Sequence, residues 1–254
     1  IYRSIKELRI ALKNHSYIQY TATPQANLLI DSFSLLSPDW HVLLEPGDEY
    51  TGGNEFFKTD KIVDFIPREG SYPDTLDDLQ QTPPKSLQTS ICEFLIMSSL
   101  MAGVGKNDIV NNRASMLIHP TWRVNESHEH NKKGIKTFKD WTSNILESFY
   151  KDIEEKDFKG IFQNSYNKLK RQFEDDDQIY FPEINEIADF IADEIIDDLL
   201  DSIWEVVGKA PQLKDGFPWN SSRYHILVGG QLLDRGFTVE NLIYTYMPRD
   251  AKGK

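Results

Sequence analysis

Short apolar segments alternate with longer helical patterns through the second half of the chain, and this alternation is what most constrains the fold. Three segments of strand length are rich in aliphatic and aromatic residues: Ala114 to Pro120, Tyr224 to Gly230 and Asn241 to Pro248. A largely apolar helical pattern precedes them, from Ser86 to Ala102. Buried strands that alternate with helices indicate a parallel sheet, covered on both faces and joined by right-handed crossovers. The predicted fold class is α/β.

Two further helical patterns lie between the first two of these strands, from about Phe138 to Phe173 and from about Pro182 to Val207. The strands at Ala114 and Tyr224 are thereby separated by about 100 residues, far more than one crossover needs. We therefore expect residues 138–210, approximately, to form an inserted helical subdomain that projects from the sheet.

The second of these patterns has an apolar face and an acidic face. Isoleucine, leucine and alanine recur every three or four residues, whereas Asp189, Asp193, Asp197 and Asp201 recur every four. A solvated helix face explains this carboxylate row, and a divalent-cation site is the alternative. Residues 172–207 contain thirteen Asp and Glu and no Lys or Arg.

The net charge of −12 is therefore local, because the remaining residues carry 27 of the 40 acidic side chains and all 28 basic ones. A nearly neutral remainder does not exclude nucleic acid as a partner, although an acidic surface repels a polyanion. The helical region from Lys132 to Arg171 contains ten Lys or Arg and six acids. It is either plain surface or a patch that contacts a nucleic-acid backbone.

The cysteine content and the hydropathy limit the class of protein. Cys92 is the only cysteine, which excludes an internal disulfide and a cysteine-rich zinc site. No segment approaches the roughly 18 apolar residues of a membrane span, and the amino terminus lacks a signal-peptide pattern. We expect a cytoplasmic protein with no membrane partner. The chain starts at Ile1 without methionine and stops just after a predicted strand, which suggests a fragment.

Two short motifs are candidates for chemistry. His15 to Thr23 is rich in β-branched and aromatic residues and ends before Pro24, so it predicts a buried strand followed by a turn. Near the other end, Gly229 and Gly230 close a predicted strand and are followed by the triplet Asp234, Arg235 and Gly236. Adjacent glycines let a backbone approach a phosphate, and arginine offers a forked set of donors to it. A tight turn in which Arg235 pairs with Asp234 is the alternative.

Taken together, these motifs resemble those of superfamily two helicases, in which a Thr-Ala-Thr-type segment ends the first RecA-like domain and an Arg-Gly turn follows a strand of the second. The closer resemblance is to the helicase-like family that carries an endonuclease domain of the Z-one type. It rests on "YTATPQANLLI", "LLEPGDEYTGGNEFF", "MLIHPTW" and "LVGGQLLDRGFTVENLIYTYMPR". The four matches keep the order of the family and extend from Tyr20 to Arg249.

The resemblance implies a RecA-like parallel sheet of the P-loop NTPase type, with the helical insertion described above. Residues 1–37 would end the first RecA-like domain, 38–85 would connect the domains through a Gly-rich loop, and 86–254 would form the second domain. The implied activity is that of a DNA-dependent, ATP-driven motor that uses ATP and magnesium. Its implied setting is bacterial, with DNA and restriction or phage-defence proteins as partners.

The resemblance also implies the candidate site. A segment that couples the nucleotide site to the nucleic-acid path would consist of Thr21, Ala22 and Thr23. The cleft for nucleotide and nucleic acid would contain His119, Gly229, Gly230, Asp234, Arg235 and Gly236. His119 would lie at the carboxyl edge of the sheet, where α/β proteins bind ligands. In the alternative, the threonine hydroxyls only cap a turn and His119 is a structural histidine.

The sequence departs from the pattern of such motors at the catalytic centre. Phosphoryl transfer of this kind needs a Gly-rich loop ending in Lys-Ser/Thr and an acidic magnesium site. The segment "GVGKN", Gly103 to Asn107, lacks both the spacing and the hydroxyl residue. We therefore expect no complete catalytic site and no metal site. The isolated chain should not hydrolyse ATP or bind ATP or magnesium tightly.

Two other functions remain open. A magnesium-dependent endonuclease would use carboxylates such as those of Asp39 and Glu45, but no acid-x-Lys step follows them in register. His128 and His130 have the spacing of a shared metal site, yet a lone His-x-His pair is usually surface. The third candidate is a non-catalytic interaction domain that uses the acidic helix.

Overall fold

The computed structural model describes residues 2–21, 37, 39–45, 47, 52, 58, 63–64, 82–105, 113–120, 128–173, 180–206, 216–229 and 238–248. The chain divides into two compact units, Ile1–Ile62 and Val63–Lys254. Each unit is described by itself.

The first unit contains the helix α1, Tyr2–Ala11. Residues 15–21 form neither helix nor strand, and Tyr20 is 89% exposed. The predicted buried strand from His15 to Thr23 is therefore wrong for residues 15–21, and its last two residues lie outside the described ones. A residue has a high strand propensity when its side chain fits a pleated, half-buried surface. The described part of this unit offers no neighbouring strand to form that surface.

The second unit is built on a four-stranded parallel sheet in the order β2-β3-β1-β4. The strands are β1 (Ala114–Ile118), β2 (Ile203–Val206), β3 (Tyr224–Gly229) and β4 (Leu242–Tyr246). The α/β class and the three predicted strands are confirmed, and all of them pair in parallel. β1 and β3 are buried at every position, as expected for central strands covered on both faces.

β2 corrects the sequence prediction, which continued a helix to Val207. The helix ends at Leu200, two residues form a turn, and the strand follows. Ile203 is 7% exposed and belongs to the same core as Leu199. The apolar periodicity therefore continues through the turn, and periodicity alone does not distinguish the last helical turn from the first strand residue.

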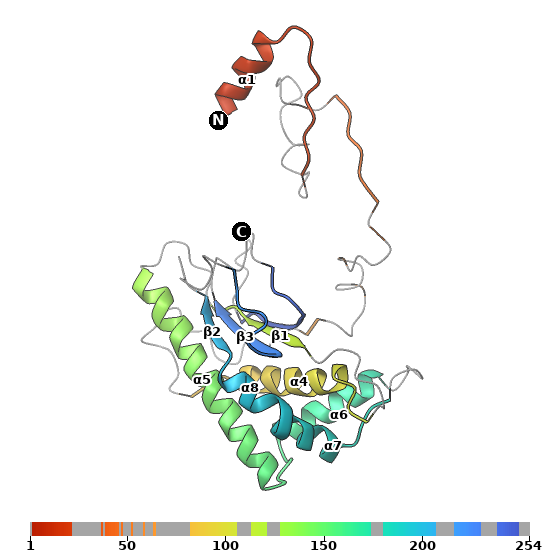
Figure 1. Ribbon diagram of the computed structural model, residues 1–254, viewed down its shortest axis with the longest axis vertical. Helices are drawn as coiled ribbons and strands as arrows, with labels where there is room; N and C mark the ends of the chain where they lie inside the picture. The colour runs from red at the N-terminus through yellow and green to blue at the C-terminus, as the bar shows by residue number, and fades with distance from the viewer. Residues whose placement is uncertain are drawn as a thin grey trace. The chain divides into compact units, whose positions relative to one another are not determined.

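Among the described residues, six helical segments accompany the sheet, and Figure 1 shows the labelled ones, α4 to α8, on one side of it. They are α4 (Lys85–Met101), α5 (His128–Glu154), α6 (Ile161–Phe173), α7 (Ile184–Phe190), the π-helical segment η2 (Ile191–Ile195) and α8 (Ile196–Leu200). α4 confirms the predicted first helix. The predicted helix from Phe138 to Phe173 is two helices, because Lys156 and Gly160 adopt positive φ values of 53° and 74° between them. None of the helices in the described ranges combines the length and the apolar character that crossing a bilayer requires.

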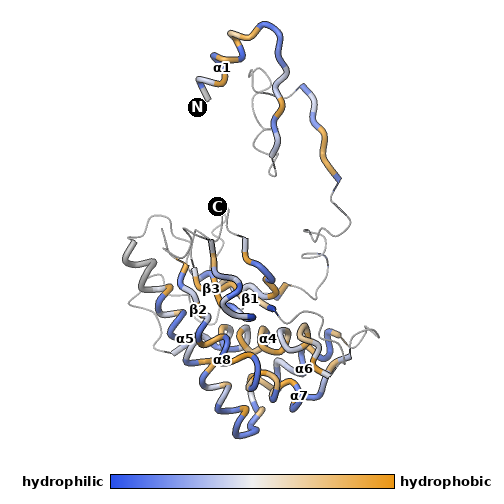
Figure 2. Tube along the Cα trace, in the orientation of Figure 1, coloured by the Kyte–Doolittle hydropathy of each residue, from blue (hydrophilic) through white to orange (hydrophobic). Residues whose placement is uncertain are grey.

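The helices do not project from the sheet, so that part of the expected helical insertion is wrong. Phe138 of α5 and Ile191 of η2 are fully buried in one core with Met116 of β1 and Ile226 of β3. Hydrophobic and hydrophilic residues alternate along α5 (Figure 2). Such an amphipathic helix must bury its apolar stripe, and a face of the sheet provides the partner.

The acidic face of the α7–α8 region is exposed at all four positions of the predicted row, Asp189, Asp193, Asp197 and Asp201. The π-helical turn of η2 widens the helix between them. Arg223 holds this region to the start of β3, because its guanidinium donates to Glu194 Oε2 and Asp198 Oδ2, each at 3.0 Å.

Candidate functional site at the carboxyl edge of the sheet

The connections between the strands define where this sheet presents a ligand site. The chain passes from β1 to β2 through α5, α6 and the α7–α8 helices on one face. The connections from β2 to β3 and from β3 to β4 run across the sheet in the opposite direction. Their described residues Phe217, Trp219 and Val239 pack on Leu117 and Leu227, on the other face. This is the arrangement expected of crossovers that share one hand.

β1 and β3 are neighbours, and the connections that follow them leave towards opposite faces. The carboxyl ends of these two strands therefore form a topological switch point, where open α/β sheets bind ligands. The pairing places Ile118 opposite Val228, so His119 and Gly229 come next on the adjacent strands. The sheet brings these two predicted residues together.

β4 completes the same edge. The backbone N–H of His119 donates to the carbonyl oxygen of Tyr246 at 2.9 Å. This bond confirms the predicted location of His119 at the carboxyl edge. Its side chain is only 1% exposed, which favours the structural role for the imidazole. Gly229 has no Cβ, so the backbone of β3 at this edge permits the close approach that a phosphate needs.

Tyr246 anchors this edge to the first turn of α4. Its side chain is 1% exposed, and its hydroxyl is 2.9 Å from Ser86 Oγ. Burial raises the pKa of Tyr246, so the phenol is neutral at ordinary pH. The amino terminus of α4 therefore lies beside the carboxyl ends of the strands, and α4 runs antiparallel to β4.

The structure does not test the remaining predicted site residues. Thr21 lies in the first unit, exposed and outside any helix or strand. The others lie outside the described residues: Ala22, Thr23, Gly230, Asp234, Arg235 and Gly236. Their roles stay predictions.

Sequence reasoning missed a buried charged cluster beside β4. Glu93 of α4 is 2% exposed, and its carboxylate accepts hydrogen bonds from Lys168 Nζ and from the hydroxyl of Tyr244, each at 2.7 Å. Lys168 also pairs with Asp64. The signal was present in the sequence, because Glu93 is the one charge in the apolar segment "SICEFLIMSSLM".

The electrostatics of this cluster favour a charged lysine and a protonated phenol. Burial alone lowers the pKa of Lys168, but its hydrogen bonds to Asp64 and Glu93 outweigh this effect and raise the pKa. Burial and the negative charge of Glu93 raise the pKa of Tyr244. The phenol is therefore the donor and the carboxylate the acceptor.

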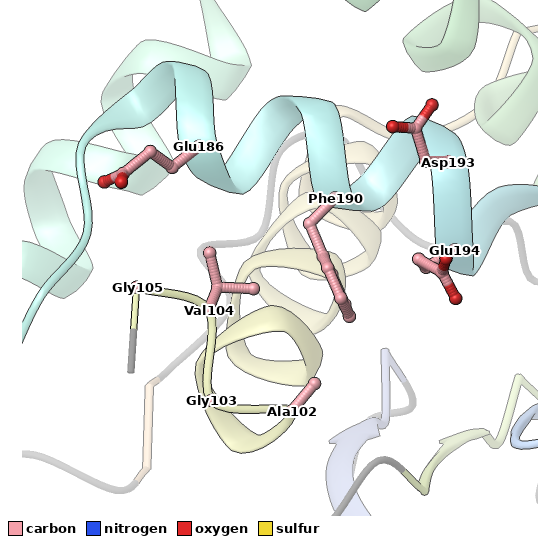
Figure 3. Close-up of a pocket in the computed structure, with 8 residues that line it drawn as sticks. All are labelled: Ala102, Gly103, Val104, Gly105, Glu186, Phe190, Asp193 and Glu194. Carbon is pink, nitrogen blue, oxygen red and sulfur yellow. The ribbon is translucent and has the colours of Figure 1, made fainter. Parts of the chain in front are cut away.

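A concave feature lies beside the carboxyl end of α4 (Figure 3). It is a cavity of about 420 Å³ between the turn that follows α4 and the acidic helices, with Val104 and Phe190 among its lining residues. Two of its carboxylates have partners inside the protein: Glu194 binds Arg223, and Glu186 accepts from the backbone N–H of Glu183. Among the residues that the structure describes, no three metal-ligating side chains cluster.

The family comparison covers most of the second unit. The family model described as Z1 domain matches residues 86–253. The chain therefore belongs to the Z1 domain family. Neither the comparison with curated proteins nor the comparison with solved structures yields a match.

Proposed function

We propose that this chain is part of a DNA-dependent, ATP-driven, helicase-like motor, in which residues 86–254 form a second RecA-like domain. The observation that carries the proposal is the switch point between the ends of β1 and β3, at His119 and Gly229, because α/β sheets bind their ligands at such points. Membership of the Z1 domain family is consistent with it. The proposed setting in bacterial restriction or phage defence rests on the sequence resemblance.

Within this proposal the chain forms one wall of the cleft. Gly229 and Gly230 would let the backbone approach a phosphate, and Arg235 would bind phosphate oxygens with two parallel hydrogen bonds. Thr21 and Thr23 would couple the nucleotide site to the nucleic-acid path. The chain has no Gly-rich loop ending in Lys-Ser/Thr, so other parts of the motor would hold the triphosphate and magnesium that supply the phosphoryl transfer.

DNA-stimulated ATP turnover by the complete protein tests the proposal. Arg235→Ala should remove most of the stimulated turnover, and Arg235→Lys should impair it as well, because an ammonium group does not reproduce the forked geometry. The matched control is Arg3→Ala, which removes an exposed arginine of α1. It should retain both basal and stimulated turnover. The 254-residue chain alone should show no turnover.

The outcomes separate the three functional classes. Stimulated turnover that survives both Arg235 variants refutes the assignment of Arg235 to the cleft. Magnesium-dependent cleavage of DNA without ATP turnover identifies the endonuclease instead. A complete protein with neither activity identifies an interaction domain.

A further inference from the structure

β4 contains one more residue than β1 can pair with. Ser115 of β1 is opposite Leu242, but the next residue, Met116, is opposite Tyr244. Ile243 is therefore a bulge. Beyond it, Tyr244 and Tyr246 both point to the α4 side of the sheet, as their bonds to Glu93 and Ser86 show. Bulges re-aim side chains next to functional sites in this way.

Two side-chain hydrogen bonds attach the bulged strand to α4. Ser86 and Glu93 are seven residues apart, which places them on one face of the helix about 10 Å apart. Tyr244 and Tyr246 are two residues apart, which places them on one face of the strand about 7 Å apart. The glutamate side chain is longer than the serine side chain, and this makes up the difference between the spacing on the helix and the spacing on the strand. The phenol of Tyr244 reaches Glu93 at 2.7 Å, and that of Tyr246 reaches Ser86 at 2.9 Å.

Apolar burial does not by itself choose the register of β4. In β4 only Tyr246 is buried, and Leu242 is 41% exposed. β4 is also an edge strand of the described sheet, and Ile243 and Tyr244 are only partly buried against the core. Burial therefore specifies the register of β4 less strongly than that of β1 or β3. Without the bulge, Tyr244 would lie opposite Leu117 and point to the other face, away from Glu93. The bond between Glu93 and Tyr244 is compatible with the bulged register alone.

A buried ion pair is by itself weak evidence of stabilisation. Replacing a buried ion pair with apolar residues of similar volume is often neutral or stabilising. We propose that Glu93, held by Lys168, is a positioning residue that selects the bulged register of β4. It thereby sets the position of the carboxyl end of β4, where the Tyr246 carbonyl accepts the N–H of His119. A slip of one residue would move this end by about 3.3 Å along the strand.

The proposal about the register does not depend on the proposed motor function. Any expected effect on ATP turnover does rest on that proposed function. Hydrogen exchange of the backbone amides of residues 242–247 in the whole chain tests the register. Tyr244→Phe removes the phenolic hydroxyl. Exchange of these amides should become about tenfold faster, as expected for the loss of a hydrogen bond to a charged group. The matched control is Tyr224→Phe on β3. Tyr224 is also buried, and its hydroxyl has no hydrogen-bond partner among the described residues, so exchange in β4 should not change.

A second pair of variants separates positioning from stability. The double variant Glu93→Leu with Lys168→Met should keep the melting temperature of the parent, yet speed exchange in β4 as much as Tyr244→Phe does. Glu93→Gln keeps an acceptor for the phenol and should restore most of the protection of β4. Unchanged exchange in β4 for both Tyr244→Phe and the double variant overturns the proposal. Faster exchange throughout the sheet also overturns it, because that identifies a general loss of stability.

The complete protein gives a further readout. If it hydrolyses ATP in response to DNA, Tyr244→Phe should lower the stimulated kcat or raise the KM for DNA, and Tyr224→Phe should change neither. Unchanged stimulated kinetics in Tyr244→Phe, with faster exchange in β4, refute the link between the register and the site. No stimulated turnover in the parent protein refutes the motor function and leaves the exchange experiment as the test of the register.

Discussion

The imidazole of His225 accepts a hydrogen bond from the indole of Trp204, with 3.2 Å between His225 Nδ1 and Trp204 Nε1. Indole nitrogen is only a donor, so Nδ1 carries no proton and Nε2 carries one. The Nε2–H group then donates to the carbonyl oxygen of Trp219, also at 3.2 Å. His225 is 2% exposed, and only its neutral form makes both hydrogen bonds, because a protonated Nδ1 cannot accept from the indole.

The first prediction is a loss of stability at acidic pH through His225. Burial lowers its pKa below the ordinary value of 6.5 and outweighs the backbone hydrogen bond to Trp219, which raises the pKa. The unfolded chain therefore takes up this proton at a higher pH than the folded chain. The stabilisation is complete above about pH 6.5 and is lost as the pH falls through the folded-state pKa.

Urea unfolding at pH 7.5 and at several lower pH values measures this effect. His225→Phe should be less stable at pH 7.5 by about 1–3 kcal/mol, because the buried indole N–H loses its partner. Its free energy of unfolding should also fall less steeply in acid than that of the parent. The exposed His15→Phe is the control and should follow the parent. Equal acid slopes in His225→Phe and the parent would contradict the prediction.

The sequence sufficed to predict β1, β3, β4 and α4 because each is a short or strongly apolar segment bounded by proline, glycine or polar residues. It did not suffice for β2. Ile203 continues the apolar spacing of the preceding helix, and only its packing beside β3 distinguishes it. For residues 15–21 the sequence predicted a strand that the structure does not contain. Aromatic and β-branched residues favour a strand wherever they occur, but they do not reveal whether a partner strand exists.

The candidate site was predictable to the extent that it depends on strand ends. His119 and Gly229 each follow a recognisable strand, and parallel strands end at one edge, so their proximity follows from topology. The contact between Glu93 and Tyr244 joins residues 151 positions apart. It depends on a bulge at Ile243, and no local pattern in the sequence predicts that bulge.

A second prediction tests whether the helices belong to the main core. Phe138 of α5 is fully buried and packs edge-on against Trp141, with ring centroids 5.1 Å apart. Phe138→Ala should lower the free energy of unfolding by about 3–5 kcal/mol in a single cooperative transition, because it leaves a cavity beside the sheet. The control Glu147→Ala changes an exposed position of the same helix and should have an effect within about 0.5 kcal/mol. Separate transitions for the helices and the sheet would support an independent subdomain instead.

A third prediction concerns the turn after α4, where Gly105 adopts a positive φ of 75°. A Cβ at this position would collide with the ring of Tyr180. Gly160 has nearly the same φ, 74°, but faces open space. Gly160→Ala should therefore lower the free energy of unfolding only by the cost of a left-handed backbone, about 1–2 kcal/mol. Gly105→Ala should lower it by more. Urea unfolding of both variants measures the difference, and equal losses would show that Tyr180 moves aside freely.

The last prediction uses Cys92, the only thiol of the chain, as a reporter of unfolding. Burial raises the pKa of Cys92 to about 12, with the charge of Glu93 adding to the effect and a hydrogen bond to Ser165 opposing it. The thiolate is the reactive form, and the raised pKa keeps Cys92 of the folded chain in the unreactive thiol form at pH 8. Alkylation by iodoacetamide should therefore be slow in the native chain, and it should reach one equivalent quickly in urea. Phe138→Ala should speed the native reaction in proportion to its loss of stability, whereas Glu147→Ala should not. Rapid alkylation of the stable native chain would show that Cys92 is accessible without unfolding and would place an opening between α4 and α6.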